Sequence, residues 1–442
     1  MSHPAPSRPA TSRYRWIICA LLFWVTTANY IDRTVFGNLA PDLQARIGWT
    51  QNQYWNMQVV FQAAYAISTL CAGRLMDLLG LRLGFTLACA FWGLAAMSHS
   101  LVRTVTEFFI VRILLGLGEG GNFPAANKAI AEWFPKKERA LAVSLFNTGS
   151  NMGGIIVPFG LPLLMPLMAR ISIAGHVLGW RGAFLVTGVV DLSWIVAWWT
   201  IYRKPQQHPK VSAAELALIN SDPPEPAVKI PWRRLFPHRQ TWAFAVVKLT
   251  DCFWWFYLTG APYFFADRFG LNLESRSVPI ALIYVAASVG GITGGWLSGH
   301  FMDRGWSVNR ARKVTMLVCA AAIVPVIFAA FTHSPWIAVG LIALACSAHQ
   351  AWSCNVFSLA GDMFPRRVVG SVTGLAGFCG SVAGIILFVS IGLMRRAAIA
   401  RGEPGNYVPI FLVAGSFYLV ALTVAHLLAP RLEPAKIDTP AG

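Results

Sequence analysis

The stretch GRLMD at residues 73–77 recurs as GHFMD at residues 299–303, and each copy follows an apolar run that is long enough to cross a membrane. A second pair, FPKK at residues 134–137 and FPRR at residues 364–367, recurs at a similar separation. Two repeats in the same order indicate that the chain consists of two similar halves. Such parallel halves are related by an axis along the membrane normal.

The composition places the protein in a membrane. Of its 442 residues, 56% are hydrophobic and only 12% are charged, and the apolar residues form long blocks. We therefore predict an all-α membrane protein with twelve transmembrane helices in two pseudo-symmetric six-helix bundles. The expected helices are centred on residues 20–30, 61–70, 86–96, 114–126, 146–158, 185–198, 253–263, 284–296, 318–328, 342–354, 375–388 and 411–424.

This pattern divides the chain into five segments. A Pro-rich, charged and hydrophilic stretch separates the two predicted bundles and is typical of a linker on the cytoplasmic side. We assign the segments as an N-terminal tail (1–15), a first bundle (16–202), a linker (203–240), a second bundle (241–429) and a C-terminal tail (430–442).

The basic residues are distributed as membrane topology requires. The formal net charge is +17, but the Lys and Arg residues are divided among short loops and tails, which argues against nucleic acid as a partner. When both termini are placed in the cytoplasm, the inner loops and tails carry most of these residues, in agreement with the positive-inside rule. We therefore expect both termini to be cytoplasmic.

The sequence contains none of the usual signs of an enzyme or a metal site. All eight cysteines lie in or beside apolar runs and lack metal-ligand spacing. We also find no nucleophile paired with a base and no phosphate-binding loop in the right context. We expect no catalytic activity, no cofactor and no bound metal.

Four charged residues interrupt the apolar runs of the first half. Asp32 and Arg33 lie in the first run, and Arg112 and Glu119 lie in the fourth. Seven residues make about two helical turns, so Arg112 and Glu119 share one helix face and both pairs can point at one cavity. Charge at bilayer depth is costly, so these residues are candidates for a functional site, with a structural brace as the alternative for each pair.

The glycines of the fourth run have two possible explanations. Gly116, Gly118 and Gly121 fit the spacing Gly-x-Gly-x-x-Gly of a dinucleotide-binding loop. No strand precedes them, however, and the run has the pattern of a continuous helix. Close packing against a neighbouring helix is therefore the better prediction.

These motifs together resemble a known family. The loop with Gly73, Asp77 and Arg82, and its second copy with Asp303 and Arg304, resemble the gating loops of the major facilitator superfamily. Within it, the anion:cation symporter branch is the closest match. That resemblance rests on NYIDR (29–33), GLGEGGNFPAA (116–126) and EWFPKKERA (132–140), and it favours the sugar-acid transporters for hexuronates or aldonates.

The resemblance and the residue types assign roles to the buried charges. The guanidinium of Arg33 is a planar fork that can bind a carboxylate through two hydrogen bonds, so we expect it to hold the substrate anion. The resemblance implies that Glu119 is linked to substrate binding with Arg112 as its partner on the same face. It also implies that Asp32 takes the driving proton and releases it to the cytoplasm.

Further substrate-binding residues are expected from both halves. In the first half, hydroxyl and amide groups line up in the predicted spans, and in the second half an aromatic wall and neutral hydrogen-bonding groups do so. The candidates are Tyr30, Tyr65, Asn147, Asn151, Trp254, Tyr257, His349, Gln350, Trp352 and Asn355. We expect two other acids, Asp191 and Asp251, to be polar groups at helix ends. Ser150 and Cys379 stand where family members commonly have amides, so the identity of the sugar acid stays open.

We therefore predict a monomeric, proton-coupled importer of a sugar-acid anion, preferably a hexuronate such as glucuronate or galacturonate, in a bacterial inner membrane. Its expected partners are a small organic anion and membrane lipid. Three alternatives remain: transport of an aromatic carboxylate such as phthalate, coupling to sodium or to exchange, and a receptor or scaffold without transport.

Overall fold

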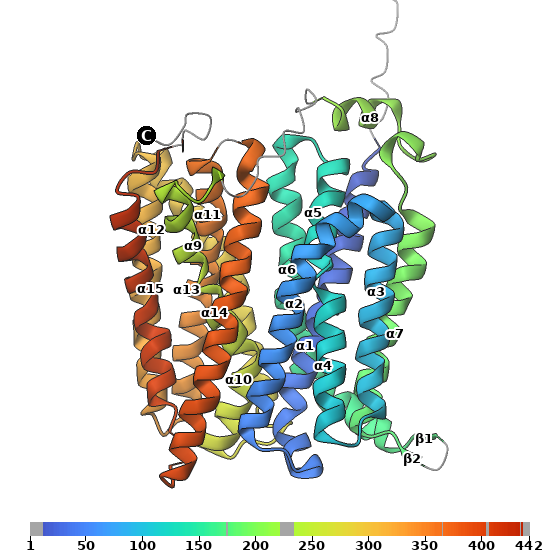
Figure 1. Ribbon diagram of the computed structural model, residues 1–442, viewed down its shortest axis with the longest axis vertical. Helices are drawn as coiled ribbons and strands as arrows, with labels where there is room; N and C mark the ends of the chain where they lie inside the picture. Colours follow the sequence, from blue (N-terminus) through green and yellow to red (C-terminus); the bar gives the residue numbers. More distant parts are fainter. Residues whose placement is uncertain are drawn as a thin grey trace, which may run out of the picture.

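The computed structural model describes residues 12–173, 176–221, 234–364, 366–403, 406–433 and 435. Two groups of long helices stand side by side, with the first half of the chain in one and the second half in the other (Figure 1). The first bundle contains α1 (Tyr14–Ile47), α2 (Gln51–Leu79), α3 (Leu81–Ser98), η1 (His99–Leu101), α4 (Val105–Glu119), α5 (Asn122–Trp133), α6 (Lys136–Ala169), β1 (Ser172–Ile173), β2 (His176–Val177) and α7 (Trp180–Ile201).

The second bundle repeats this arrangement after a short linker. The linker contains η2 (Pro205–Gln207) and α8 (Ala213–Ile219). The second bundle consists of α9 (Arg239–Lys248), α10 (Asp251–Phe269), α11 (Ser277–Asp303), α12 (Val308–Ile323), η4 (Val324–Ala330), α13 (Pro335–Met363), α14 (Arg366–Ala400) and α15 (Val408–Leu428).

The twelve predicted membrane passes are confirmed. Nine helical stretches among the described residues are apolar and long enough to cross a membrane. The other three passes are α1, whose charges lower its hydropathy, and the pairs α4–α5 and α9–α10, each of which is interrupted by a short break. The break between α4 and α5 falls at Gly120 and Gly121, because glycine is a poor helix former.

The glycines in and directly after α4 pack closely on neighbouring helices, as the sequence predicts: a Cβ atom on Gly118 would lie 2.6 Å from the Cβ of Trp92 on α3. A Cβ atom on Gly116 would lie 2.5 Å from the carbonyl oxygen of Phe61, and one on Gly120 would lie 2.6 Å from the Cβ of Ser68. Any larger residue at these two positions would therefore push α2 and α4 apart. This contact fixes the height of α2 against α4, and both helices contribute to the site described below.

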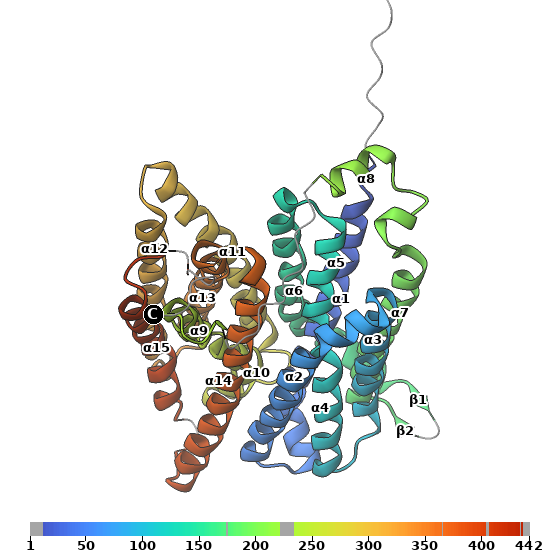
Figure 2. The same cartoon turned by 45° about the horizontal axis from the view of Figure 1, so that its top comes forward.

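The two ends of the molecule differ. We call the end that carries α8 and the start of α1 the linker end, and the end that carries the α1–α2 turn the opposite end (Figure 1). When the molecule is tilted toward the viewer, its two bundles are seen as separate units (Figure 2). Contacts between them are made by α1, α2 and α6 of the first bundle with α10, α14 and α11 of the second.

Hydrogen bonds and ion pairs join the bundles at the opposite end. Arg276 of the second bundle forms an ion pair with Asp42 of the first. Arg395 donates to the Oε1 atom of Gln51 at 2.9 Å and to the Oδ2 atom of Asp267 at 2.8 Å. Gln51 also donates to Asp267, at 2.7 Å. We call these five residues the clasp, and they close the opposite end.

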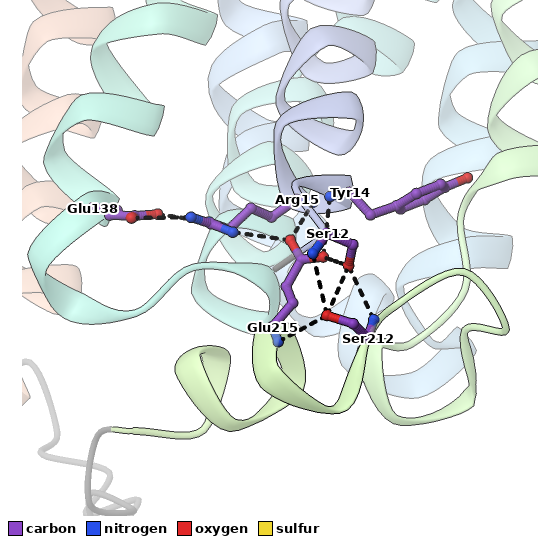
Figure 3. Close-up of polar contacts among 6 residues, drawn as sticks. All are labelled: Ser12, Tyr14, Arg15, Glu138, Ser212 and Glu215. Carbon is purple, nitrogen blue, oxygen red and sulfur yellow. Dashed lines mark hydrogen bonds and ion pairs between the residues drawn. The ribbon is translucent and has the colours of Figure 1, made fainter. Parts of the chain in front are cut away.

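At the linker end, a polar network fixes α8 to the first bundle (Figure 3). The carboxylate of Glu215 accepts hydrogen bonds from the backbone N–H groups of Tyr14 and Arg15, both at 3.1 Å, and from the Arg15 guanidinium at 3.0 Å. Arg15 also bonds to Glu138 on α6 at 2.7 Å. The hydroxyl of Ser12 completes the network by donating to Glu215. The linker is thus attached to the first half.

Candidate functional site

An ion pair between Arg33 and Glu119 lies at the centre of the first bundle. Arg33 is on α1 and Glu119 is the last residue of α4, and the Nε atom of the arginine donates to the Oε2 atom of the glutamate. Their side chains are 1% and 0% exposed. Among the described residues, no group forms a hydrogen bond with Nη1 or Nη2 of Arg33, or with Oε1 of Glu119. The outer edge of the guanidinium is therefore available for another anion.

Four aromatic rings surround the guanidinium of Arg33. Its central carbon lies 4.5 Å from the ring centre of Tyr65, 5.1 Å from that of Tyr30 and 5.2 Å from that of Phe61. The fourth ring, that of Trp255, belongs to α10 of the second bundle and lies 4.6 Å away. Cation–π attraction favours this arrangement. Through Trp255 the second half contacts the charged group of the first.

Arg112 is a second buried cation beside this ion pair. Its Nη2 atom donates to the Oε1 atom of Gln58 at 2.9 Å, and its guanidinium lies 4.1 Å from the ring centre of Phe61. Within the described part of the chain, its Nε and Nη1 atoms have no hydrogen-bond partner. Arg112 is close to Glu119, but the direct ion pair of Glu119 is with Arg33.

A narrow space lies between the two bundles at this level. Helices α1, α2 and α4 line it from the first half, and α10 and α14 line it from the second. The lining residues are Arg33, Gln58, Phe61, Gln62, Arg112, Trp255, Leu258, Thr259 and Phe388. Two arginines against one glutamate leave this region one positive charge in excess, so it is suited to an anion.

Asp32 points away from this space. Adjacent residues of an α-helix project about 100° apart, so Asp32 and Arg33 face different neighbours. The carboxyl of Asp32 faces that of Asp191 on α7, near enough for a hydrogen bond between them. Our expectation for Asp191 was wrong: it lies in the middle of α7 and is fully buried. The sequence alone gave no partner for it, because only packing brings α7 against α1.

Asp251, the other acid expected at a helix end, does lie there. It is the first residue of α10, directly after the break that separates α10 from α9. Its carboxylate forms an ion pair with Lys248, the last residue of α9.

One pair of predicted polar residues connects the halves. The Nε2 atom of Gln350 on α13 donates to the Oδ1 atom of Asn151 on α6 at 3.0 Å. Asn147 lies one turn earlier on α6 and is half-buried. Asn151 and Gln350 therefore meet at the interface of the bundles.

The other candidates of the second half pack inside the second bundle. Trp254 stacks on His349 with ring centres 5.7 Å apart, and the Nδ1 atom of His349 lies 2.6 Å from the hydroxyl of Tyr418. Trp352 packs edge-on against the same tyrosine. Two further candidates, Tyr257 and Asn355, are also buried in this bundle. Asn355 donates a hydrogen bond to a backbone oxygen of α11.

Of the residues that line the space near Arg33, sequence reasoning named only Arg33 and Arg112. Trp255, Gln58 and Gln62 are three of those that it missed. Trp255 is adjacent to the predicted Trp254, and hydropathy does not distinguish the two positions. Gln58 and Gln62 are spaced four residues apart on α2, so they share a helix face with Tyr65. That polar stripe in an apolar run is a signal that was present in the sequence.

The loop residues of the repeated motif lie at the linker end. Asp77 forms an ion pair with Lys128 of α5, at 2.6 Å between Oδ1 and Nζ. Arg82 donates to the backbone oxygen of Trp199 on α7. Gly73 lies exposed near the end of α2, and Asp303 and Arg304 lie exposed at the end of α11. The first copy of the motif therefore connects α2 to α5 and α3 to α7.

Comparison with known proteins gives related transporters. The chain is 28% identical over 434 residues to the hexuronate transporter of Escherichia coli (strain K12), with 96% of each chain covered. It is 29% identical over 381 residues to the probable L-galactonate transporter of the same strain, with 83% of this chain and 81% of that protein covered.

Solved structures share its fold. The xylose transporter XylE from Escherichia coli in an inward open conformation matches with a TM-score of 0.71 and 14% identity, over 94% of this chain and 96% of that chain. A bacterial homolog of the human lysosomal transporter Spinster matches with a TM-score of 0.69 and 19% identity, over 95% and 96%. The family model described as Major Facilitator Superfamily matches residues 22–388. This match spans most of both bundles, and the chain therefore belongs to the Major Facilitator Superfamily of membrane transporters.

Proposed function

We propose that this protein imports a sugar-acid anion together with protons. The observation that carries the proposal is the pair of buried arginines, Arg33 and Arg112, whose free N–H groups lie at the interface of the two bundles. Buried N–H groups on a cation are costly unless a partner binds them. A substrate carboxylate satisfies two such groups at once.

The remaining lining suits a hydrophilic acid. The side chains of Gln58, Gln62 and Thr259 offer neutral donors and acceptors for sugar hydroxyls around the same space. The relatives named above include transporters for hexuronate and, in one probable case, L-galactonate. We favour a hexuronate such as glucuronate or galacturonate as the substrate.

Glu119 provides a route to proton coupling. Its carboxylate occupies the Nε edge of Arg33 and therefore competes for the charge that a substrate anion would use. Protonation of Glu119 would weaken that ion pair and leave Arg33 to the substrate. Asp32, buried on the other side of α1, is the second proton carrier in this proposal.

The orientation follows from charge and closure. We place the linker end in the cytoplasm, because the loops and tails at that end are rich in Lys and Arg. The bonds of the clasp between the two bundles at the opposite end support a carrier that is closed to the outside in this arrangement. Rocking of one bundle on the other would then expose the site to each side in turn.

Uptake by reconstituted vesicles tests the proposal. We expect an inward proton gradient to drive accumulation of radiolabelled glucuronate. Asp32→Asn and Glu119→Gln should each abolish the response to the gradient, whereas Glu274→Gln, at an exposed loop, should leave it unchanged. Accumulation that ignores the gradient, or that persists in both variants, would contradict proton coupling. Accumulation that is driven by a sodium gradient would indicate sodium coupling, and accumulation that is driven by a counter-anion would indicate exchange.

A second candidate substrate is an aromatic carboxylate such as phthalate. It is favoured by the aromatic rings that surround Arg33, which suit a flat apolar ligand as well as a cation. Thermal-shift measurements with glucuronate, galactonate and phthalate separate the candidates, since a bound ligand raises the unfolding temperature. Stabilisation by phthalate alone would decide for the aromatic acid. Binding of a sugar acid without accumulation in vesicles would instead indicate a receptor.

A further inference from the structure

Two buried carboxyl groups face each other inside the first bundle, away from the site at Arg33. Asp32 on α1 is 2% exposed and Asp191 on α7 is 0% exposed. Their carboxyls lie near enough for one to donate a hydrogen bond to the other. Helix α3 closes the third side of this contact. A Cβ atom on Gly93 would lie only 2.9 Å from the Cβ of Asp191, so glycine makes room for the aspartate.

Among the described residues, no cation forms an ion pair with either carboxyl. Within the same part of the chain that the structure describes, no donor forms a hydrogen bond of good geometry with any of the four carboxyl oxygens of Asp32 and Asp191. The hydroxyl of Thr187 and the indole of Trp92 approach the pair, and the Thr187 hydroxyl is bonded at 3.2 Å to the backbone oxygen of Phe184.

The ionisable groups on the adjacent helices do not neutralise the pair either. Helix α4 contributes Glu119, which is itself an acid, and Arg112, which donates a hydrogen bond to Gln58 at 2.9 Å. Helix α3 contributes the thiol of Cys89, which lies 3.5 Å from the backbone oxygen of Asp191. Arg33, the neighbour of Asp32 on α1, is paired with Glu119. The nearest full charge of opposite sign is thus engaged elsewhere.

Two negative carboxylates in contact cannot both persist in such a place. Burial disfavours each charge, and repulsion between the two adds to that cost. One proton removes both problems, because a protonated carboxyl can donate to its ionised neighbour. We propose that Asp32 and Asp191 hold one proton between them, and that Asp191 is a second residue of the proton-binding site. This deepens the proposed function and rests on it.

The pair of Asp32 and Asp191, which we call the dyad, is placed to respond to the substrate site. Glu119 acts on Asp32 through its negative charge, and the same Glu119 pairs with Arg33, the neighbour of Asp32 on α1. When a substrate anion takes over Arg33, the charge balance on both sides of α1 changes. Neither Asp32 nor Asp191 is among the residues that line the space between the bundles, so this pair acts on transport by binding the proton and not the substrate.

Infrared spectroscopy of the purified transporter tests the dyad directly. At neutral pH the exposed carboxyls are ionised, so a carboxylic-acid C=O band that shifts in D₂O reports a buried protonated group. We expect Asp191→Asn and Asp32→Asn each to lose the same band, because an asparagine amide can donate to the remaining carboxylate and so replaces the shared proton. Glu274→Gln is the control and should keep the band. Retention of the band in Asp191→Asn would overturn the proposal.

A second variant covers the case in which Asp191→Asn does not fold. Asp191→Glu keeps a carboxyl at this position but changes its length, so the band should shift in frequency instead of disappearing. An unshifted band in this variant would also overturn the proposal. In vesicles, Asp191→Asn should move the pH dependence of uptake to lower pH, since the amide stabilises ionised Asp32.

The two proposals fail in different ways. The infrared band reports a bound proton without any transport. If both variants lose the band but wild-type uptake ignores a proton gradient, the dyad stands and proton coupling is wrong. If uptake follows the gradient but Asp191→Asn keeps the band, the coupling stands and the dyad is wrong.

Discussion

The two bundles share a repeat and a fold, yet they use charge differently. The middle of the first bundle buries five charged or ionisable residues: Asp32, Arg33, Arg112, Glu119 and Asp191. The middle of the second is mainly aromatic, with Trp254, His349 and Tyr418 packed together, and the charges of Lys248 and Asp251 beside them pair with each other. The repeat therefore preserves helix packing, while most of the charge buried in the middle of the molecule belongs to the first half. The second half supplies a surface, chiefly Trp255, that closes over the charges of the first.

The largest effect on substrate affinity is expected from a substitution in the first bundle, which carries the buried charges. Arg33→Lys keeps the charge but cannot reproduce a planar fork that binds Glu119 and a carboxylate together. We expect substrate affinity to fall roughly 10- to 100-fold, which corresponds to about 1.5–3 kcal/mol for one hydrogen bond to a charged group. Binding to purified protein measures it, and Arg181→Lys, over Trp180 at the opposite end, is the matched control. Wild-type affinity in Arg33→Lys would remove this residue from the site.

A smaller effect should separate the two neighbouring tryptophans of the second half. Trp255→Leu removes the ring above Arg33, and cation–π loss of about 1–2 kcal/mol should weaken substrate affinity. Trp254→Leu, inside the bundle against His349, should instead lower the unfolding temperature and leave affinity near wild type. Isothermal titration and thermal unfolding on both variants measure the contrast. Equal losses of affinity would mean that the second half contributes more than a single contact.

The smallest effect concerns the linker, which is attached to the first half. Burial alone would raise the pKa of Glu215, but hydrogen bonds from Ser12 and from the backbone of Arg15 and Tyr14 hold its pKa below the ordinary value. This contribution to stability is therefore present above the ordinary carboxyl range and is lost as the pH falls through the lowered pKa.

We expect Glu215→Gln to lower the free energy of unfolding by about 1–2 kcal/mol at neutral pH. On acidification, the stability of this variant should fall less than that of the wild type. Thermal unfolding between neutral pH and about pH 3, below the ordinary pKa of a glutamate, measures both. Glu433→Gln, which alters an exposed acid at the other end of the chain, serves as control. Identical pH dependence in wild type and Glu215→Gln would show that the linker contact adds nothing.

Much of this architecture was predictable because its signals are strong. Long apolar runs fix the number of passes, and the repeated loop fixes the division into halves. Charges such as Arg33 and Glu119 stand out in those runs and need a partner or water, so the charged part of the site could be named from sequence.

The rest depended on which way a side chain points. Trp254 and Trp255 are both apolar and adjacent, and only the packed structure shows which one faces Arg33. A polar residue in a span can also bury itself inside its own bundle, as His349 does with Tyr418, instead of facing the other half. Asp191 was wrongly assigned to a helix end, because its contact with Asp32, which is far away in the sequence, is visible only in the packed structure.

The clasp gives the protein a resting preference. The Arg276–Asp42 ion pair and the bonds of Gln51 to Arg395 and Asp267 join the two halves, so we expect an empty carrier to break them before it opens at this end. The side chain of Asp42 is 39% exposed, so dissolved salt screens its attraction to Arg276. We therefore expect the ionic strength of the medium at this face of the membrane to affect how strongly the empty transporter favours the conformation in which the opposite end is closed.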